Sequence, residues 1–251
     1  MGARLSAAGN VGRWSRCCTG TAASTGDKGT AVKIGIIGAG NIGGALTRLF
    51  TKAGHQVAVA NSRGPHTLAD LAAETGATAV EAADAAQGAD LVIVTIPQKH
   101  IPALPAGILD GAAEGATFVD TGNYYPRERD GAIDEIEAGA LESEWVQRQL
   151  GKPVVKAFNN IGAASLFENG KPAGSPGRIA LPISGDDAAA KAVVAGVIEE
   201  IGFDVVDVGP LSESWRQQPG TPGYGADFGA ERLRVALGEA GRERTEAFRA
   251  Q

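Results

Sequence analysis

Three glycines, Gly38, Gly40 and Gly43, have the G-x-G-x-x-G spacing directly after a run rich in β-branched residues, and a helical apolar pattern follows at once. In this context the first glycine permits a tight turn, the second lets a pyrophosphate approach the backbone, and the third lets the helix pack on the strand. The helix would direct unpaired N–H groups and its positive dipole end at the phosphates. The alternative is a glycine turn without a ligand. The predicted dinucleotide contacts are Gly38, Ala39, Gly40, Asn41, Ile42 and Gly43.

The end of the predicted second strand carries polar residues of a kind that selects between the two nicotinamide dinucleotides. NAD-specific proteins of this architecture place an Asp or Glu there, which holds the ribose 2′-hydroxyl. This chain has Asn61, Ser62 and Arg63 instead. A hydroxyl and a guanidinium would bind a 2′-phosphate that a carboxylate would repel. The sequence therefore favours NADP over NAD, and the alternative is an ordinary exposed loop.

The carboxyl ends of later strands supply further candidates, because ligands of open α/β sheets bind beyond those ends. Thr95, Ile96 and Pro97 end a continuous apolar run, and His100 follows them. His100 would contact the cofactor or cap the next helix. The next apolar strand leads to Asn123, Tyr124 and Tyr125, which would form a ring-lined pocket wall or pack on the body of the protein.

A further strand over residues 153–160 reaches the same edge of the predicted sheet. It carries Lys156, which would be either a charge in the site or a residue at a solvated strand end, and the second interpretation is favoured. Asn123, Asn159 and His100 are the candidates nearest the nicotinamide, and the sequence indicates no clear catalytic residue.

The alternation of strand and helix patterns predicts an α/β fold: a Rossmann-type, doubly wound, mostly parallel sheet with helices on both faces and a short C-terminal extension. Asp186 is the expected N-cap of a helix over residues 187–201. Residues 127–150 are strongly charged and are expected to form a surface excursion with a helix over 141–150. The extension, about 211–251, is expected to hold a loop and a helix over 231–249. Residues 31–251 would form one NADP-binding domain.

Composition narrows the function classes. The chain has 251 residues and a formal net charge of -6, which does not suggest binding to nucleic acid or to an anionic membrane. No apolar run is long enough to cross a bilayer. Residues 1–30 are expected to be a disordered tail, either an extension or the result of a misplaced start. They hold Arg4, Arg13 and Arg16 but no acidic residue before Asp27, so an organelle transit peptide is the alternative. A cytoplasmic location is expected.

Several segments together resemble one family. They are the glycine turn, Ser62-Arg63, Thr95–Pro97 with His100, Val154–Asn159, Ser184–Asp186 and Asp207–Leu211. In this set the chain resembles the NADPH-dependent reductases of coenzyme F420, a deazaflavin, and also the oxidoreductase domain of the STEAP metalloreductases. The resemblance runs from about Lys33 to Trp215, and it is not specific for the second substrate.

The resemblance implies that NADPH lies along the carboxyl edge of the sheet and that an isoalloxazine-like ring stacks on the nicotinamide. It places Ser62 and Arg63 on the 2′-phosphate, and Ile96, Pro97, Ala157 and Asn159 near the nicotinamide. The chain departs from the archaeal deazaflavin reductases at Asn123–Pro126 and beyond Trp215. The second ring should lie there, so the identity of the acceptor stays open.

The pattern contains no Ser-His-Asp set, no metal-ligand spacing and no clear acid–base pair. That absence fits hydride transfer between two flat rings, which the protein only needs to hold face to face. The expected function is therefore hydride transfer between NADPH and a deazaflavin or flavin. The alternatives are reduction of a ferric or cupric chelate through flavin, reduction of a carbonyl or imine, and a non-catalytic NADP sensor. The expected partner is a small redox co-substrate, and a homodimer is left open.

Overall fold

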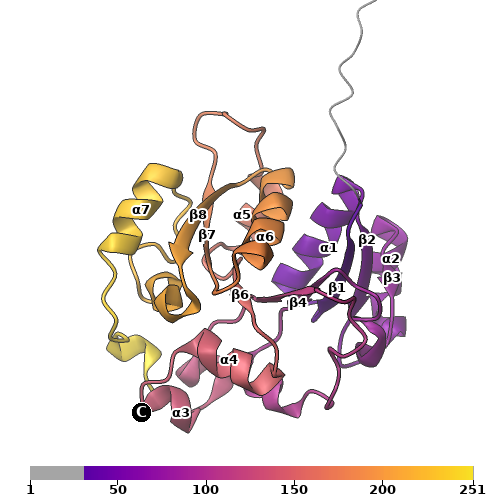
Figure 1. Cartoon of the computed structure of the whole chain (residues 1–251), viewed down its shortest axis with the longest axis horizontal. Helices are drawn as coiled ribbons and strands as arrows, with labels where there is room; N and C mark the ends of the chain where they lie inside the picture. The colour runs from indigo at the N-terminus through magenta and orange to yellow at the C-terminus, as the bar shows by residue number, and fades with distance from the viewer. Residues whose placement is uncertain (1–30, 251) are drawn as a thin grey trace, which may run out of the picture. The chain divides into compact units, whose positions relative to one another are not determined.

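One eight-stranded sheet organises the computed structural model, which describes residues 31–250. The strand order is β3-β2-β1-β4-β5-β6-β7-β8 (Figure 1). The strands are β1 (Lys33–Ile37), β2 (Gln56–Ala60), β3 (Thr78–Ala79), β4 (Leu91–Val94), β5 (Thr117–Asp120), β6 (Val155–Lys156), β7 (Ala180–Ser184) and β8 (Asp204–Gly209). All neighbours pair in parallel except β6 and β7. The predicted Rossmann-type, mostly parallel sheet is confirmed.

The chain begins in the middle of this sheet, moves outward through β2 to β3, and returns to place β4 on the other side of β1. The strand order therefore reverses between β1 and β4. Ligands of open α/β sheets bind beyond the carboxyl ends of the strands at such a reversal. The glycine turn after β1 and Thr95–Pro97 after β4 lie at this point.

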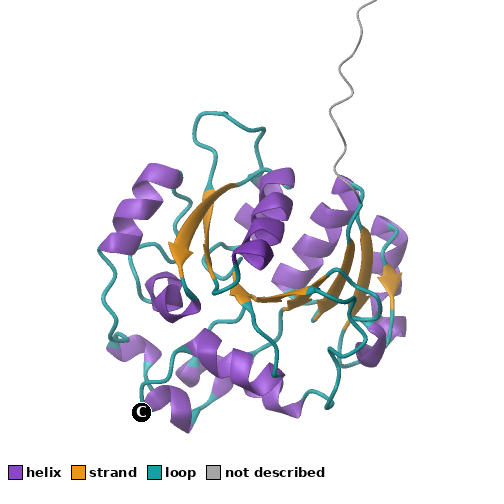
Figure 2. Ribbon diagram, in the orientation of Figure 1, coloured by secondary structure: helices purple, strands orange, loops and turns teal. Residues whose placement is uncertain are grey.

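Helices cover both faces of the sheet (Figure 2). On one face, Ile34 and Ile36 of β1 pack with Leu46 and Phe50 of α1 and with Val194 of α6. This layer consists of α1 (Asn41–Ala53), α2 (Ala69–Thr75), α5 (Ala163–Glu168) and α6 (Ala188–Glu200). The inward residues of α1 recur at helical spacing, and Gly54 ends the helix with the left-handed conformation usual at this position.

The opposite face of the sheet is covered by residues 127–150, for which a surface position was expected. Val92 and Val94 of β4 contribute to a second cluster with Ile136, Trp145 and Val146. These belong to α3 (Asp134–Glu137) and α4 (Glu142–Leu150). The interpretation of residues 127–150 as a surface excursion was therefore wrong, because the charged residues alternate with apolar ones that cover the sheet.

Two details of the C-terminal half also differ from expectation. The N-cap of α6 is Asp187, whose carboxylate accepts hydrogen bonds from the backbone N–H groups of Ala189 and Ala190, whereas Asp186 accepts one from the N–H of Leu211. The terminal helix is shorter than predicted. It is α7 (Ala230–Gly238), which packs on β7 and β8 through Leu233 and Leu237, and a short 3-10 helix η6 (Glu246–Phe248) follows.

Five further short segments complete the described chain, and three of them matter for the site. These three are the 3-10 helix η3 (Gln98–Ala103), the π-helix η4 (Pro126–Asp130) and the 3-10 helix η5 (Leu211–Gln217). The remaining two are η1 (Pro65–Leu68) and η2 (Ala82–Asp84). Residues 1–30, for which a tail or a transit peptide was expected, lie outside the described residues. Within the described chain, none of the helices combines the length and the apolar character needed to span a bilayer.

Candidate functional site

The three glycines of the turn have different surroundings. A Cβ on Gly38, whose φ is +111°, would lie 2.3 Å from the Thr95 carbonyl oxygen, and one on Gly43 would lie 1.9 Å from the Gly38 carbonyl oxygen. Packing within the protein therefore requires glycine at both positions. A Cβ on Gly40 would meet no atom within 4 Å. Its φ of -75° is also one that any residue adopts. Neither packing nor backbone conformation therefore requires glycine at position 40, and the missing side chain leaves the space beside the backbone that a pyrophosphate needs.

Gly40 is the N-cap of α1, and no side chain caps this helix. Its first N–H groups are therefore available to an anion, and the helix dipole favours negative charge there. Two hollows meet at Gly40, Asn41 and Ala163. We call them the inner cavity, about 380 Å³, and the outer groove. The first lies toward the carboxyl ends of β4 and β5, and the second lies between α1, α2 and α5. The residues at the junction of the two hollows fit the diphosphate of a dinucleotide.

The corner after β2 is shaped by Asn61. Its side chain accepts a hydrogen bond from the Arg63 N–H at 2.8 Å and donates one to the Thr67 hydroxyl at 2.9 Å. Asn61 therefore stabilises the turn that presents the next two residues. Ser62 and Arg63 are exposed, and Arg63 lines the outer groove. Within residues 31–250 no carboxylate pairs with the Arg63 guanidinium, so its charge is available to a ligand.

The inner cavity gathers residues from the ends of four strands. Its lining comprises Gly40, Asn41, Ile42, Thr95, Ile96, Pro97, Thr121, Gly122, Asn123, Tyr125, Arg129, Phe158, Asn159, Ile161, Ala163 and Tyr224. Phe158 has a φ of 61° and is the single non-glycine residue of the described chain in the left-handed region. Such a conformation costs free energy and persists where surrounding structure enforces it, often at functional sites. Phe158 is buried and packs edge-on against Phe50, which holds it in place.

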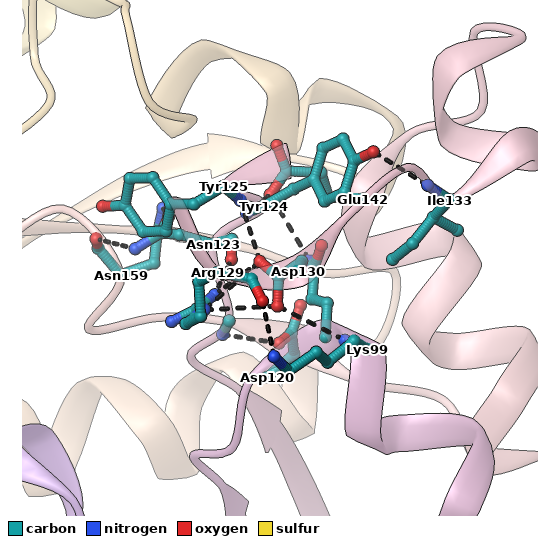
Figure 3. Close-up of polar contacts among 12 residues, drawn as sticks. Lys99, Asp120, Asn123, Tyr124, Tyr125, Arg129, Asp130, Ile133, Glu142 and Asn159 are labelled. Atoms are coloured by element: carbon teal, nitrogen blue, oxygen red, sulfur yellow. Dashed lines mark hydrogen bonds and ion pairs between the residues drawn. The ribbon is translucent and has the colours of Figure 1, made fainter. Parts of the chain in front are cut away.

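Tyr124 and Tyr125 point in opposite directions (Figure 3). Tyr124 is buried, and its hydroxyl donates to Glu137 at 2.8 Å and accepts from the Ile133 N–H at 2.9 Å. Tyr125 instead faces the inner cavity. Trp215 does not border the cavity, and Arg216 stacks on its ring. Of the two tyrosines that the sequence offered as a ring-lined pocket wall, only Tyr125 therefore borders the cavity.

A chain of side-chain hydrogen bonds fixes the cavity wall. Asn123 and Asn159 exchange bonds: the Asn123 amide donates to the Asn159 carbonyl at 2.8 Å, and the Asn159 amide donates to the Asn123 side-chain oxygen at 3.0 Å. Gln217 donates to the Asn159 side-chain oxygen at 2.9 Å and accepts from the Ser184 hydroxyl at 2.9 Å. Asn123 also donates to the Tyr224 hydroxyl at 3.2 Å. The two asparagines are thus oriented by fixed partners.

A cation that also lines the cavity, Arg129, and a buried carboxylate, Asp130, adjoin this wall. The Arg129 guanidinium stacks 5.0 Å from the Tyr125 ring centroid, pairs with Asp130 at 2.9 Å, and donates to the Asn123 carbonyl. Asp130 is buried and also accepts from the Tyr125 N–H at 2.9 Å. The Lys99 ammonium donates to the Arg129 carbonyl at 2.5 Å (Figure 3). The loop 123–130 is therefore held in place by charge-assisted bonds.

Comparison with known proteins agrees with this geometry. Residues 33–124 match the family model described as NADP oxidoreductase, coenzyme F420-dependent. The chain is similar to an uncharacterised protein of Sinorhizobium meliloti, with 35% identity and a TM-score of 0.67 over 79% of this chain and 95% of that one. The chain belongs to this family of NADP oxidoreductases. It is therefore an NADP-dependent oxidoreductase.

Two further relatives extend the comparison. A protein of Arthrobacter sp. FB24, proposed to be an F420-dependent NADP reductase, is 27% identical with a TM-score of 0.62, over 84% of this oxidoreductase and 96% of that chain. The protein YjhV of Escherichia coli (strain K12) is 47% identical over 62 residues. That match covers 25% of this chain and 45% of YjhV, so the chain matches less than half the length of this curated relative.

Six predicted site residues line neither hollow of the oxidoreductase: Gly38, Gly43, Asn61, Ser62, His100 and Ala157. Ala157 is fully buried in the core, and its neighbour Phe158 lines the inner cavity instead. His100 is exposed within η3 and borders neither hollow. Asn123 and Asn159, by contrast, lie together at the cavity wall. Tyr224 and Arg129 were missed. Tyr224 lies in the part of the C-terminal extension that was expected to be a loop. The sequence of this loop does not fix its path, so it gave no signal that Tyr224 reaches the cavity.

Lys156 is not at a solvated strand end, and that interpretation was wrong. Its side chain is 2% exposed and pairs with Asp120, also 2% exposed, at 2.9 Å. The ammonium also donates to the Gly122 carbonyl at 2.5 Å, and Asp120 accepts from the Gly122 N–H at 2.7 Å. The pair joins the ends of β5 and β6 and fixes Gly122, which lines the cavity. Lys156 therefore supports the site from beneath and does not line it.

Proposed function

We propose that this oxidoreductase transfers a hydride between NADPH and the deazaflavin ring of coenzyme F420. The observation that carries the proposal is the open inner cavity between the glycine turn and the loop 123–130. Flat or apolar groups, including Ile96, Pro97 and Phe158, lie on its walls. Two ring systems held face to face at such a place need little beyond positioning to exchange a hydride.

The chain's own residues would hold the dinucleotide from end to end. Gly40 and the N-terminus of α1 would take the diphosphate, and Ser62 with Arg63 would take the 2′-phosphate. The nicotinamide would then reach the inner cavity beside Thr95–Pro97, with Asn123 and Asn159 as its amide-bearing neighbours. NADPH supplies the hydride when bound, and the protein orients it toward the acceptor.

A purely sensing role is less well supported, because the aromatic residues do not fill the space. Tyr124 and Trp215 pack elsewhere, and Tyr125 lies at the border of a cavity of about 380 Å³. Such a hollow leaves room beside a bound dinucleotide for part of a second ring.

An acceptor panel tests the proposal. Purified protein with NADPH is offered coenzyme F420, FMN, FAD, a ferric chelate with and without flavin, and a series of ketones and imines, and NADPH oxidation is followed. We expect F420 to give the highest kcat/KM. Turnover of ketones or imines with none of the ring acceptors would overturn the proposal, and the absence of any turnover despite tight NADPH binding would favour a sensor.

A further inference from the structure

Two tyrosines from distant parts of the sequence meet at the wall of the inner cavity. Tyr125 follows β5, and Tyr224 follows η5, yet their hydroxyl groups are hydrogen-bonded to each other. Both residues line the inner cavity and both are half-buried. The sequence pattern indicated no acid–base group, because only the fold brings these side chains together.

Counting hydrogens shows what this pair can offer to a ligand. Two hydroxyl groups carry two hydrogens, and their mutual bond uses one of them. The Asn123 amide donates to the Tyr224 oxygen at 3.2 Å, so this contact occupies a lone pair and not a hydrogen. Across residues 31–250, no other group accepts a hydrogen bond from either hydroxyl. One O–H of the pair is therefore left for a molecule in the cavity.

The surroundings of Tyr224 keep its hydroxyl group protonated. Burial raises the pKa of Tyr224 above its ordinary value, and the hydrogen bond with Tyr125 acts in the same direction. The negative charge of Glu142 adds to this, while Arg129 opposes it. Asp130 faces the pair through the Tyr125 backbone N–H, and Arg129 stacks on the Tyr125 ring. Tyr224 thus keeps the hydrogen that the pair can donate, and the Arg129 cation would stabilise the anion left after donation.

We propose that the Tyr125–Tyr224 pair donates the proton that accompanies hydride transfer to the acceptor, an inference that rests on the proposed function. A hydride added to a carbon of a conjugated acceptor moves an electron pair onto the conjugated nitrogen or oxygen. That atom takes the proton as the tyrosine O–H bond breaks. The tyrosinate, shared with the second hydroxyl, regains its proton from water. The sum is NADPH, acceptor and one proton giving NADP and the reduced acceptor.

The inference also restricts the substrate class. An acceptor must present a hydrogen-bond-accepting nitrogen or oxygen conjugated with the carbon that receives the hydride. Deazaflavins satisfy this requirement, as do ketones and imines, whereas a flavin takes the hydride on a ring nitrogen and a metal chelate has no such atom pair. Proton donation by a positioned side chain contributes about 100- to 10,000-fold in rate.

Phenylalanine variants test the pair. Tyr125→Phe, Tyr224→Phe and the double variant are compared with Tyr124→Phe, which removes a hydroxyl one residue away that points out of the cavity. NADPH affinity, thermal melting, kcat with the best acceptor, and the ratio of kcat in H₂O and D₂O are measured. We expect NADPH affinity within about twofold of wild type, about a 100-fold lower kcat in the double variant, smaller losses in the single variants, and near-normal kcat for Tyr124→Phe.

The isotope ratio separates a proton donor from a structural contact. For the donor, wild type should show slower turnover in D₂O, and this ratio should change in the double variant. A lower kcat with an unchanged isotope ratio would overturn the proposal, as would an unchanged kcat in a folded double variant. If the double variant does not melt cooperatively, the single variants decide by the same ratio. Wild-type turnover of ketones alone would refute the F420 proposal and leave this test intact on the ketone.

Discussion

Gly38, Gly40 and Gly43 are glycines for different physical reasons. The first and third are required by the protein's own backbone, since an added Cβ would lie 2.3 Å from the Thr95 oxygen and 1.9 Å from the Gly38 oxygen. Gly40 faces open space. A motif that looks uniform in the sequence thus separates into two positions that stabilise the fold and one that serves the ligand.

This difference predicts opposite outcomes for two alanine variants. Gly40→Ala should melt like wild type but bind NADPH about 10- to 100-fold more weakly, because the methyl group enters space reserved for the diphosphate. Gly43→Ala should lower the free energy of unfolding by roughly 1–3 kcal/mol or more through overpacking. Differential scanning calorimetry and equilibrium titration measure both. If Gly40→Ala bound NADPH as tightly as wild type, the diphosphate would not bind at this turn.

Arg63 is the residue that should select the phosphorylated dinucleotide. It is exposed at the outer groove, and hydrogen bonds to a charged group contribute about 1.5–3 kcal/mol. Arg63→Ala should therefore weaken NADPH binding about 10- to 100-fold and leave NADH binding nearly unchanged. Arg232→Ala, which removes an arginine stacked on Phe228, is the matched control. An equal loss for both dinucleotides would contradict the role given to Arg63.

At the scale of elements, the buried Asp120–Lys156 pair links β5 to β6 directly beneath the cavity. Lys156→Met would leave the Asp120 carboxylate buried without its partner, which costs about 3–5 kcal/mol. The double variant Asp120→Asn/Lys156→Met should recover much of this loss. Urea unfolding of the two single variants and the double variant gives the coupling energy. Strictly additive effects would show that the two residues do not stabilise the fold as a pair.

The sequence predicted the elements with strong local patterns and failed where long-range contacts decide. The strand before the glycine turn, the helix after it, the second strand before Asn61 and the apolar strand before Asn123 were expected from local patterns, and the structure has β1, α1, β2 and β5 there. Lys156 was misread because a charged residue after Val155 gives no sign of Asp120, which lies 36 positions earlier. Asp186 and Asp187 are equally suitable N-caps by residue type. They differ in the structure because the Asp186 carboxylate accepts a hydrogen bond from the distant Leu211 N–H.

The candidate site divides in the same way. The glycine turn, the corner at Asn61–Arg63 and Thr95–Pro97 are local motifs, and the structure places them along one continuous path. The far wall joins Tyr125 to Tyr224, which is 99 positions away, and Asn159 to Gln217, which is 58 away. No local pattern encodes such pairs, so Tyr224 could not be predicted.

At the scale of the whole molecule, the last described residues return to brace the loop 123–130. Arg244 pairs with the buried Glu142 at 2.6 Å and stacks 4.9 Å from the Tyr124 ring centroid. Phe248 contacts the Tyr125 ring at a centroid distance of 6.0 Å. The C-terminal segment thus supports the cavity wall from behind, although it contributes no residue to the cavity lining.

This brace should make stability depend on alkaline pH through Tyr124. Burial raises the Tyr124 pKa from 10.0 to about 12. The unfolded state therefore loses the proton first, so the stabilisation is complete below pH 10 and is lost as pH rises toward about 12. The loss should approach roughly 2–3 kcal/mol, at 1.36 kcal/mol per pKa unit. Tyr124→Phe should flatten this slope in urea unfolding series, and an unchanged slope would exclude Tyr124 as its source.

Transfer of a labelled hydride tests the central claim most directly. NADPH carrying deuterium at one or the other face of nicotinamide C4 is incubated with the protein and coenzyme F420, and the reduced product is analysed by mass spectrometry. A hydrogen on the ring carbon of a deazaflavin does not exchange with water, whereas one on a flavin nitrogen does. We expect one deuterium in the deazaflavin, from only one of the two labelled NADPH molecules. Reduced deazaflavin that carries no label from either of the two labelled NADPH molecules, or no reduced deazaflavin at all, would contradict the proposed transfer.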